Sequence, residues 1–524
     1  MESSLEQFFA PFRRNIIGQH QTFDSPFGQQ ELRYADWTAT GRAYGPIEAC
    51  IQQQIMPFLA NTHTETTLTG RLMTEAYDQA KVIIKQHVHA QSEDILIFCG
   101  SGMTAAVNKL QRILGLRIPE RIMDYVQSQN LQAKEAIQDC PLPIQQRLET
   151  CLSVDEALKP VVFVTHMEHH SNQISWLETI ATVEIIPPDE AGNVDLTYFT
   201  HLLNQYQHRQ TKIAAITACS NVTGIHTPYY KIAKLIHSYG GLCFVDFACS
   251  APYIDINMHP AETGADLDAI YFSPHKFLGG PGSAGVLIFN QKLYHNAVPD
   301  QVGGGTLSYT NPWQVHHYVT SIEQREDGGT PAILQGIKAA LCIRLKEAMG
   351  VENIQKRKEE LLQMVFDRFT TMPQVQMLAG HCKNRLGVIS FLIEGVHYNL
   401  VVKVLNDRFG IQTRGGCSCA GTYGHYLLQV NPVQSTKLLK SIQACDLGHK
   451  PGWVRLSIHP TITNAEVTYL LDAIEWTATH REECVAKYRY DRVSNQYTNL
   501  VTEPNQFVQI QDWFSVSHWA NPDL

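Results

Sequence analysis

Residues 268–282, with the sequence DAIYFSPHKFLGGPG, constrain the fold more than any other stretch of this chain. The apolar run from Ala269 to Phe272 predicts a short buried strand, and a polar turn with three glycines follows directly. Lys276 therefore follows the carboxyl end of a strand, which is the edge where α/β proteins bind ligands. A lysine among apolar neighbours loses its proton more readily than an exposed one, and a neutral amine forms a Schiff base with an aldehyde.

A second apolar strand with an acidic end precedes it. Residues 241–252, GLCFVDFACSAP, carry Asp246 about thirty residues before Lys276. A carboxylate beside a pyridinium nitrogen, together with a Schiff-base lysine, is what a pyridoxal phosphate site needs. Either residue alone has a plainer explanation, as a solvated loop lysine or as an aspartate that caps a turn. Their occurrence on successive strands favours a cofactor site.

The segments VDFACSAP (245–252) and FSPHK (272–276) resemble motifs of the class V aminotransferase and cysteine desulfurase family of pyridoxal phosphate enzymes. The group II cysteine desulfurase and selenocysteine lyase branch is the most similar, and the amino-terminal domain of molybdenum cofactor sulfurase is similar as well. The resemblance runs from about Tyr34 to about Glu475. It implies an α/β protein of fold-type I, with a mostly parallel sheet in a large domain and a smaller α+β carboxyl-terminal domain.

The hydrophobic pattern agrees with an α/β fold. Apolar runs at 94–99, 160–165, 183–186 and 213–217 predict further strands, and helical periodicity occurs between them and at 68–88. Four divisions of the chain are expected. They are an amino-terminal segment (1–33), a large cofactor-binding domain (34–335) with a helical insertion at about 110–158, a small domain with the cysteine loop and Arg455 (336–480), and a carboxyl-terminal extension (481–524).

Composition excludes several classes of partner. The net charge of −9 argues against nucleic acid, because phosphate binding needs a basic surface. No apolar run reaches the roughly 18 residues of a membrane span, and the opening MESSLEQFFAPFRRN lacks the apolar core of a signal peptide. Thirteen cysteines without a secretory start indicate reduced thiols. We therefore expect a cytoplasmic protein.

A phosphate site is predicted where the strand at 94–99 runs into Gly100-Ser-Gly-Met-Thr. Backbone N–H groups at the start of a helix bind phosphate well, although a Gly-Ser-Gly turn alone is weak evidence. Met103 replaces a polar residue that is frequent in the family, which leaves one donor fewer. The resemblance implies phosphate or cofactor contacts at Gly102, Met103, Thr104, Ser273 and His275. It also implies contacts from the partner subunit at Gly305 and Thr306, hence a homodimer with shared active sites.

Histidines follow the strand at 160–165, in the segment HMEHHSN (166–172). The resemblance implies that His169 stacks on the pyridoxal ring, where an imidazole can move protons near neutral pH. Three histidines and a glutamate could instead bind a metal, but no partner ligands stand out elsewhere, so no metal is expected and His166 and His170 are interpreted as structural.

Two further positions concern the ring and the substrate. Asn221, in SNVTG, corresponds to a residue that faces the cofactor and the substrate carboxylate in the family, although this is also a plain turn sequence. Cys249 stands where the family often has a glutamine that bonds the pyridoxal hydroxyl, and a thiol is a weak donor.

The sulfur chemistry is predicted at RGGCSCAG, residues 414–421. A desulfurase needs a mobile thiolate near cations. Counted from Arg414, Cys419 falls where group II enzymes carry the persulfide cysteine, and Cys417 remains an alternative nucleophile. The pair could also be half of a metal site or two packing residues. Arg455, in WVRLS, corresponds to the residue that binds the substrate α-carboxylate in a bidentate pair, the alternative being a plain surface arginine.

The resemblance therefore implies a pyridoxal phosphate-dependent cysteine desulfurase. It would take sulfur or selenium from a small cysteine-like amino acid, leave alanine and a persulfide on Cys419, and pass sulfur to an acceptor protein. Lys276, His169 and Cys419 are the predicted catalytic residues. The alternatives are a class V aminotransferase, epimerase or lyase with spectator cysteines, which predicts turnover without a persulfide, and a non-catalytic scaffold, which predicts no absorbance from bound cofactor.

Overall fold

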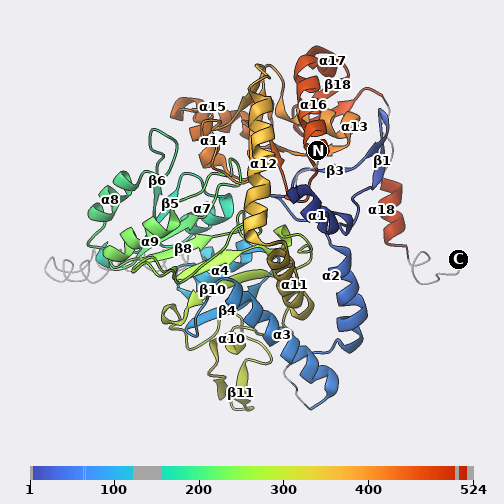
Figure 1. The fold of residues 1–524 in the computed structure, drawn as a ribbon. Helices are drawn as coiled ribbons and strands as arrows, with labels where there is room; N and C mark the ends of the chain where they lie inside the picture. The colour runs from blue at the N-terminus through green and yellow to red at the C-terminus, as the bar shows by residue number, and fades with distance from the viewer. Residues whose placement is uncertain (1–3, 63, 65, 122–155, 502–506, 516–524) are drawn as a thin grey trace.

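A seven-stranded sheet forms the centre of the larger part of the molecule (Figure 1). The structure is a computed structural model, and it describes residues 4–62, 64, 66–121, 156–501 and 507–515. The order of the strands in this sheet is β4-β10-β9-β8-β7-β5-β6, and β10 is antiparallel to both neighbours while the other pairs are parallel. The strands are β4 (Asp94–Cys99), β5 (Val161–Thr165), β6 (Thr182–Ile186), β7 (Lys212–Thr217), β8 (Leu242–Asp246), β9 (Ala269–Phe272) and β10 (Gly285–Asn290).

The predicted α/β class is confirmed, and the strands predicted at 94–99 and 269–272 have those bounds. Alternate residues of each strand belong to different hydrophobic clusters on the two faces of the sheet. In β4, for example, Leu96 and Phe98 lie in one cluster and Ile95 and Ile97 in the other. A sheet that is buried on both faces explains why these strands are almost continuously apolar in sequence.

Helices cover both faces of this sheet. One face packs against α4 (Met103–Ile113) and α7 (His170–Leu177). The other face packs against α3 (Leu68–His87), α8 (Leu196–Gln205), α9 (Tyr229–Ser238) and α11 (Ile333–Met349). Because β5, β7, β8 and β9 are parallel, their carboxyl ends lie at the same edge of the sheet. Ligands bind at this edge in this class of fold.

The chain then enters a smaller part of the molecule through α12 (Val351–Phe369), the long helix that crosses the middle of Figure 1. Its sheet is antiparallel and has the order β13-β14-β17-β16. Its elements are β13 (Val375–Met377), β14 (Val388–Ile393), α13 (Tyr398–Phe409), β15 (Ile411–Gln412), β16 (Arg414–Gly416), α14 (Gly421–Leu427), α15 (Pro432–Gln443), β17 (Trp453–Ser457) and α16 (Asn464–Thr479). This mixture of helices and antiparallel strands agrees with the predicted α+β character.

The amino-terminal segment packs against the smaller part. It contains α1 (Ser4–Arg14), the hairpin β1 (Thr22–Ser25) and β2 (Gly28–Glu31), and β3 (Arg33–Tyr34). The last of these pairs in parallel with β15. From there the chain returns to the larger part through α2 (Gly45–Cys50), a π-helical turn (Ile51–Ile55) and a 3₁₀ turn (Met56–Phe58).

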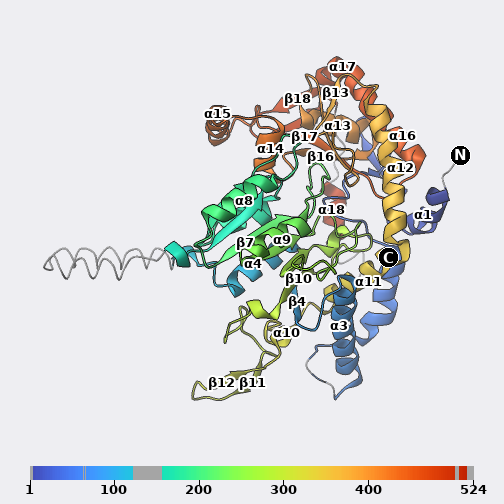
Figure 2. The ribbon, with the colours of Figure 1, turned by 60° about the vertical axis from the view of Figure 1, so that its left-hand side comes forward.

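Three further segments extend from this framework. The hairpin β11 (Leu307–Thr310) and β12 (His316–Tyr318) projects as an arm in Figure 2, followed by α10 (Ile322–Arg325). The tail contains α17 (Arg481–Ala486), the hairpin β18 (Tyr488–Asp491) and β19 (Gln496–Asn499), and α18 (Phe507–Trp513). The hairpin packs on α13, where the Tyr488 hydroxyl donates to Asp407 (3.1 Å). Most of the predicted insertion at 110–158 lies outside the described residues.

No helix among the described residues combines the length and the apolar character that crossing a membrane requires.

A buried carboxylate, Glu168, joins two strands and a helix at the ligand-binding edge of the large sheet. Its Oε1 accepts from the N–H and hydroxyl of Thr165 at the end of β5 (3.2 and 2.6 Å) and from the N–H of Thr217 at the end of β7 (2.9 Å). Its Oε2 accepts from Asn172 Nδ2 in α7 (2.8 Å). Burial raises the pKa of Glu168 to about 7, although these hydrogen bonds oppose the shift.

This raised pKa predicts a pH dependence of stability. Between pH of about 4.5 and 7 the folded protein holds a proton on Glu168 that the unfolded chain releases. The free energy of unfolding therefore falls by about 1.4 kcal/mol per pH unit as pH rises through this window. Glu168→Gln removes this titration, so the deficit of the variant relative to wild type should shrink steadily from pH 4.5 to 7 in urea-unfolding curves. Glu178→Gln, an exposed change at the end of α7, serves as the control, and a pH-independent deficit for Glu168→Gln would contradict the assignment.

Candidate active site

A cavity of about 680 Å³ lies where the carboxyl ends of the large sheet meet the smaller part. This volume is in the range of small-molecule sites. Its walls come from the amino-terminal segment, the start of α4, the ends of β7 and β8, the turn after β9, and the smaller sheet. Its lining includes Gly102, Met103, Thr104, His169, Asn221, Asp246, Ser273, His275, Lys276, Cys419 and Arg455. The structure thus brings together the predicted residues other than Gly305 and Thr306.

Lys276 lies in the short turn Pro274–Lys276 that follows β9. Two residues of the amino-terminal segment support this turn, because the Thr40 hydroxyl and the Gly41 N–H both donate to the carbonyl of His275 (3.1 and 2.9 Å). Any side chain at Gly41 would meet Phe277 O at 2.0 Å, so glycine is required there. Lys276 Nζ has no hydrogen-bond partner among the described residues. Burial lowers the pKa of Lys276, which favours a neutral amine, although the charges of Cys249 and Asp246 oppose this shift.

Asp246 ends β8 and is buried, with 3% of its surface exposed. Its Oδ1 accepts from the Ala248 N–H (2.8 Å), while Oδ2 has no partner in the described part of the chain. Burial raises the pKa of Asp246 to about 6, and the charge of Lys276 opposes this rise. A cationic group next to Oδ2 would lower this pKa again and stabilise the ionised form.

The amino end of α4 forms another wall. Gly102 precedes the helix and approaches Ser273 closely, since a Cβ there would lie 2.9 Å from Ser273 Oγ. The Met103 N–H donates to Ser273 Oγ (2.8 Å), and the Thr104 hydroxyl contacts Ser171 Oγ (2.8 Å). His275 uses Nδ1 with Thr40 (3.1 Å), and burial lowers its pKa to about 4. These hydroxyls and the amino end of α4 form a site suited to an anion.

His169 caps the amino end of α7. Its Nδ1 accepts from the Ser171 N–H (3.1 Å), which leaves the ring proton on Nε2. Burial, followed by the charge of Lys276, lowers the pKa of His169 to about 3. The imidazole on the cavity wall is therefore neutral at physiological pH, and its orientation is fixed by the helix that Glu168 anchors.

Two arginines of the smaller sheet face the cavity together. Arg414 on β16 and Arg455 on β17 are directly paired across the antiparallel ladder. Like charges in this arrangement repel each other. Asp36 offsets the repulsion, because its Oδ1 accepts from Arg455 Nη2 (2.7 Å) and its Oδ2 from Arg414 Nε (2.9 Å). Arg455 Nη1 also donates to the carbonyl of Asn221 (3.2 Å), while its Nε is buried without a partner in the described part of the chain.

The cysteine loop closes the same cavity. Ser418 and Cys419 have φ values of +52° and +56°, a left-handed conformation that non-glycine residues rarely adopt. Cys419 is exposed and also lines the cavity, whereas Cys417 is half-buried against the hydrophobic core. Asn221 holds the loop from the opposite wall, with Nδ2 donating to the carbonyl of Ser418 (2.7 Å). The two cysteines of the loop therefore differ in their surroundings: Cys419 borders the cavity, and Cys417 packs against the core.

Cys249 lies in the cavity wall beside a second thiol, Cys219. The Cys219 thiol donates a hydrogen bond to the sulfur of Cys249, and the Cys249 thiol donates weakly to the carbonyl of Ser220 (3.7 Å). The hydrogen bond from Cys219 lowers the pKa of Cys249, while burial raises that of Cys219. No sequence pattern pointed to Cys219. Sequence reasoning also missed Asp36, whose position between two arginines depends on contacts across 378 and 419 residues.

Gly305 and Thr306 lie away from this cavity within the chain. Gly305 borders a different hollow near Lys81, and the buried Thr306 donates to Gly303 O (2.7 Å). The family resemblance predicted that these two residues contact the phosphate in the site of a partner subunit, and a single chain does not test this prediction.

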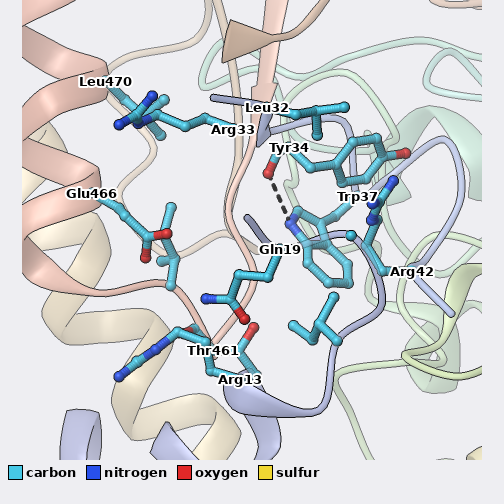
Figure 3. A pocket seen from close by; sticks show the side chains of 13 residues that line it. Arg13, Gln19, Leu32, Arg33, Tyr34, Trp37, Arg42, Thr461, Glu466 and Leu470 are labelled. Carbon is cyan, nitrogen blue, oxygen red and sulfur yellow. Dashed lines mark hydrogen bonds between the residues drawn. The ribbon is translucent and has the colours of Figure 1, made fainter. Parts of the chain in front are cut away.

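A smaller hollow lies on the other side of β3 (Figure 3). Tyr34, Trp37 and Arg42 line it, and the amide of Gln19 points into it, with the Trp37 ring N–H bonded to Tyr34 O (3.1 Å). Its volume of about 60 Å³ is too small for pyridoxal phosphate. The chemistry-bearing groups are thus concentrated in the large cavity.

The groups around the large cavity fit pyridoxal phosphate. Within the described part of the chain, an unpartnered amine (Lys276), a carboxylate oxygen without a donor (Asp246 Oδ2) and a buried amide oxygen without a partner (Asn221 Oδ1) are unusual features of a protein interior. They match the aldehyde, the ring nitrogen and the substituents that such a cofactor brings, and the start of α4 suits its phosphate. Among the described residues no group of three His, Cys, Asp or Glu side chains could hold a metal ion.

Comparison with known proteins gives the family. The model of the family "Aminotransferase class-V" matches residues 153–470. A protein named probable cysteine desulfurase from Halalkalibacterium halodurans is 28% identical over 405 residues, which cover 76% of this chain and 86% of that protein. A protein of the same name from Staphylococcus aureus is 25% identical over 409 residues, covering 77% and 87% of the two chains.

Solved structures share the fold. The apo structure of a cysteine desulfurase from Thermococcus onnurineus has a TM-score of 0.66 at 20% identity and covers 90% of this chain and 98% of that one. The cysteine desulfurase CsdA of Escherichia coli has a TM-score of 0.64 at 19% identity, with coverage of 90% and 98%. The predicted fold-type I architecture is therefore confirmed. Together with the cavity, the family match shows that this chain belongs to the class V aminotransferases, a family of pyridoxal phosphate-dependent enzymes.

Proposed function

We propose that this protein is a cysteine desulfurase, which removes sulfur or selenium from a cysteine-like amino acid, leaves alanine and carries the sulfur as a persulfide on Cys419. The observation that carries the proposal is the position of Cys419. Its thiol borders the cavity of Lys276 and Asp246 and is also exposed to solvent. A sulfur carrier needs both, because it must reach the substrate and then meet an acceptor.

Each cavity residue has a proposed task. Gly102, Met103, Thr104, Ser273 and His275 would hold the phosphate, while Asn221 and His169 would contact the ring. Asp246 would keep its charge beside the ring nitrogen, and Lys276 Nζ would hold the cofactor and move the proton of the substrate Cα. When bound, pyridoxal phosphate supplies an electron sink to the amino acid.

The sulfur step uses the chain's own thiol. The Cys419 thiolate forms an S–S bond with the substrate sulfur, while the C–S bond breaks and its electron pair remains with the carbon skeleton that becomes alanine after protonation. Arg455 would bind the substrate α-carboxylate, with its unpartnered Nε as an available donor.

The proposed assembly is a cytoplasmic homodimer, in which Gly305 and Thr306 complete the phosphate site of the partner. A sulfur-acceptor protein would collect the persulfide, and no nucleic acid or membrane partner is proposed.

The nucleophile is tested with two matched serine variants. Purified protein with pyridoxal phosphate should show the absorption band of the bound cofactor, respond to L-cysteine, and release alanine with protein-bound persulfide. Cys419→Ser should retain the band and the response but lose persulfide, and sulfide release should fall by about 10³ or more. Cys417→Ser, two residues away, should stay near wild type.

Other outcomes would separate the alternatives. Turnover of an amino acid without any persulfide would favour an aminotransferase, epimerase or lyase. The absence of a cofactor band even after adding pyridoxal phosphate would favour a non-catalytic scaffold. Full sulfide release by Cys419→Ser would remove Cys419 from the mechanism.

The carboxylate contact is tested at Arg455. Lys keeps the charge but cannot form a bidentate pair, so Arg455→Lys should raise the KM for L-cysteine about tenfold with the cofactor band unchanged. Steady-state kinetics measure the KM, and an absorbance spectrum of the same protein measures the cofactor band. Arg408→Lys, whose guanidinium stacks on Trp476 outside the cavity, is the control. An unchanged KM in Arg455→Lys would mean that another group binds the carboxylate.

A further inference from the structure

We infer that His170 is the positioning residue of the cysteine loop: its main-chain N–H holds Cys419 and its imidazole holds the backbone of Gly421, so that the Cys419 thiol stays at the cavity. The inference deepens the proposed function and rests on the assignment of Cys419 as the sulfur carrier. The sequence alone favoured a merely structural histidine at this position.

Two hydrogen bonds connect His170 with the loop on both sides of one residue, Ala420. The main-chain N–H of His170 donates to the carbonyl of Cys419 (2.7 Å), and the Gly421 N–H donates to Nε2 of the His170 ring (2.8 Å). Gly421 is the first residue of α14, whose first N–H groups have no partner within the helix. The imidazole thus replaces the missing acceptor and fixes the point where the loop becomes a helix.

The loop needs such restraint because its backbone is strained. Ser418 and Cys419 are consecutive non-glycine residues in the left-handed region, a conformation that persists only when the surroundings hold it. Two contacts besides those of His170 hold it, from Asn221 to Ser418 O (2.7 Å) and from the Thr422 hydroxyl to Gln173 Oε1 (2.8 Å). Without the acceptor at His170, we expect the backbone around Cys419 to relax toward ordinary dihedral angles.

His170 is suited to this task chemically. Nε2 accepts a hydrogen bond, so the ring is neutral and carries its proton on Nδ1. Burial, and next the charge of Lys450, lower the pKa of His170, which supports the neutral form. Its ring does not line the cavity, unlike that of the preceding residue, His169. Adjacent residues at the start of α7 therefore serve the cofactor cavity and the sulfur-carrying loop separately.

The test compares variants of the cofactor-loaded protein by hydrogen exchange of the peptide 414–424. His170→Phe keeps an aromatic ring but cannot accept, so exchange at Gly421 should accelerate about tenfold, the effect of one lost hydrogen bond. His170→Gln places an amide oxygen near the position of Nε2 and should restore most of the protection. His170→Ala gives the same comparison if the phenylalanine variant does not fold. His295→Phe, at an exposed histidine, should leave the peptide unchanged.

Kinetics supply a second readout that a general loss of stability would not produce. In His170→Phe the rate of persulfide formation should fall about tenfold, while the L-cysteine concentration that half-saturates the absorbance change stays constant, and His170→Gln should recover the rate. Unchanged exchange in peptide 414–424, or no recovery by glutamine, would overturn the inference. Exchange is measured without substrate, so a protein that never forms a persulfide would refute the proposed function while leaving the exchange result intact.

Discussion

The buried carboxylate of Glu168 is the interaction on which the geometry of the site depends. One oxygen receives donors from the ends of β5 and β7, and the other receives the Asn172 amide from α7. A polar group buried at this depth is tolerated only when it is hydrogen-bonded, so the two strands and the helix are held in one arrangement. The next two residues, His169 and His170, connect this anchor to the cofactor cavity and to the cysteine loop.

The cavity is lined by both neutral and charged side chains. Burial is the main cause of the low pKa of His169, and charges on Lys276, Arg455 and Arg414 lower it further. Asp36 binds two of these cations, while burial keeps the pKa of Asp246 near 6 until a cation adjoins it. The cavity therefore favours a ligand with both negative and positive groups, and this preference follows from residues of five separate segments.

Local sequence patterns predicted much of this fold and less of the site. β4 and β9 have the predicted bounds because continuous apolar runs ending in turn residues leave few alternatives. Lys276 and Asp246 were predictable because each directly follows or ends such a strand. Asp36 was not, since its role arises from two arginines that become neighbours only through strand pairing. Likewise, spacing favoured Cys419 but could not show that Cys417 packs against the core.

The cavity exists only because the two parts of the molecule and the amino-terminal segment meet there. Lys276 and Asp246 belong to the large sheet, whereas Arg455 and Cys419 belong to the smaller part, so neither part alone forms the cavity. The segment around Asp36 lies between them: Ala35 O and Thr38 N bond to Ser457 at the end of β17, and Gly41 supports the turn of Lys276. A displacement of this segment would therefore change the distance between the lysine and the arginine directly. Precise placement matters for such chemistry, since small misalignments of reacting groups cost large factors in rate, and this explains why an irregular segment near the amino terminus is fixed by backbone contacts on both sides.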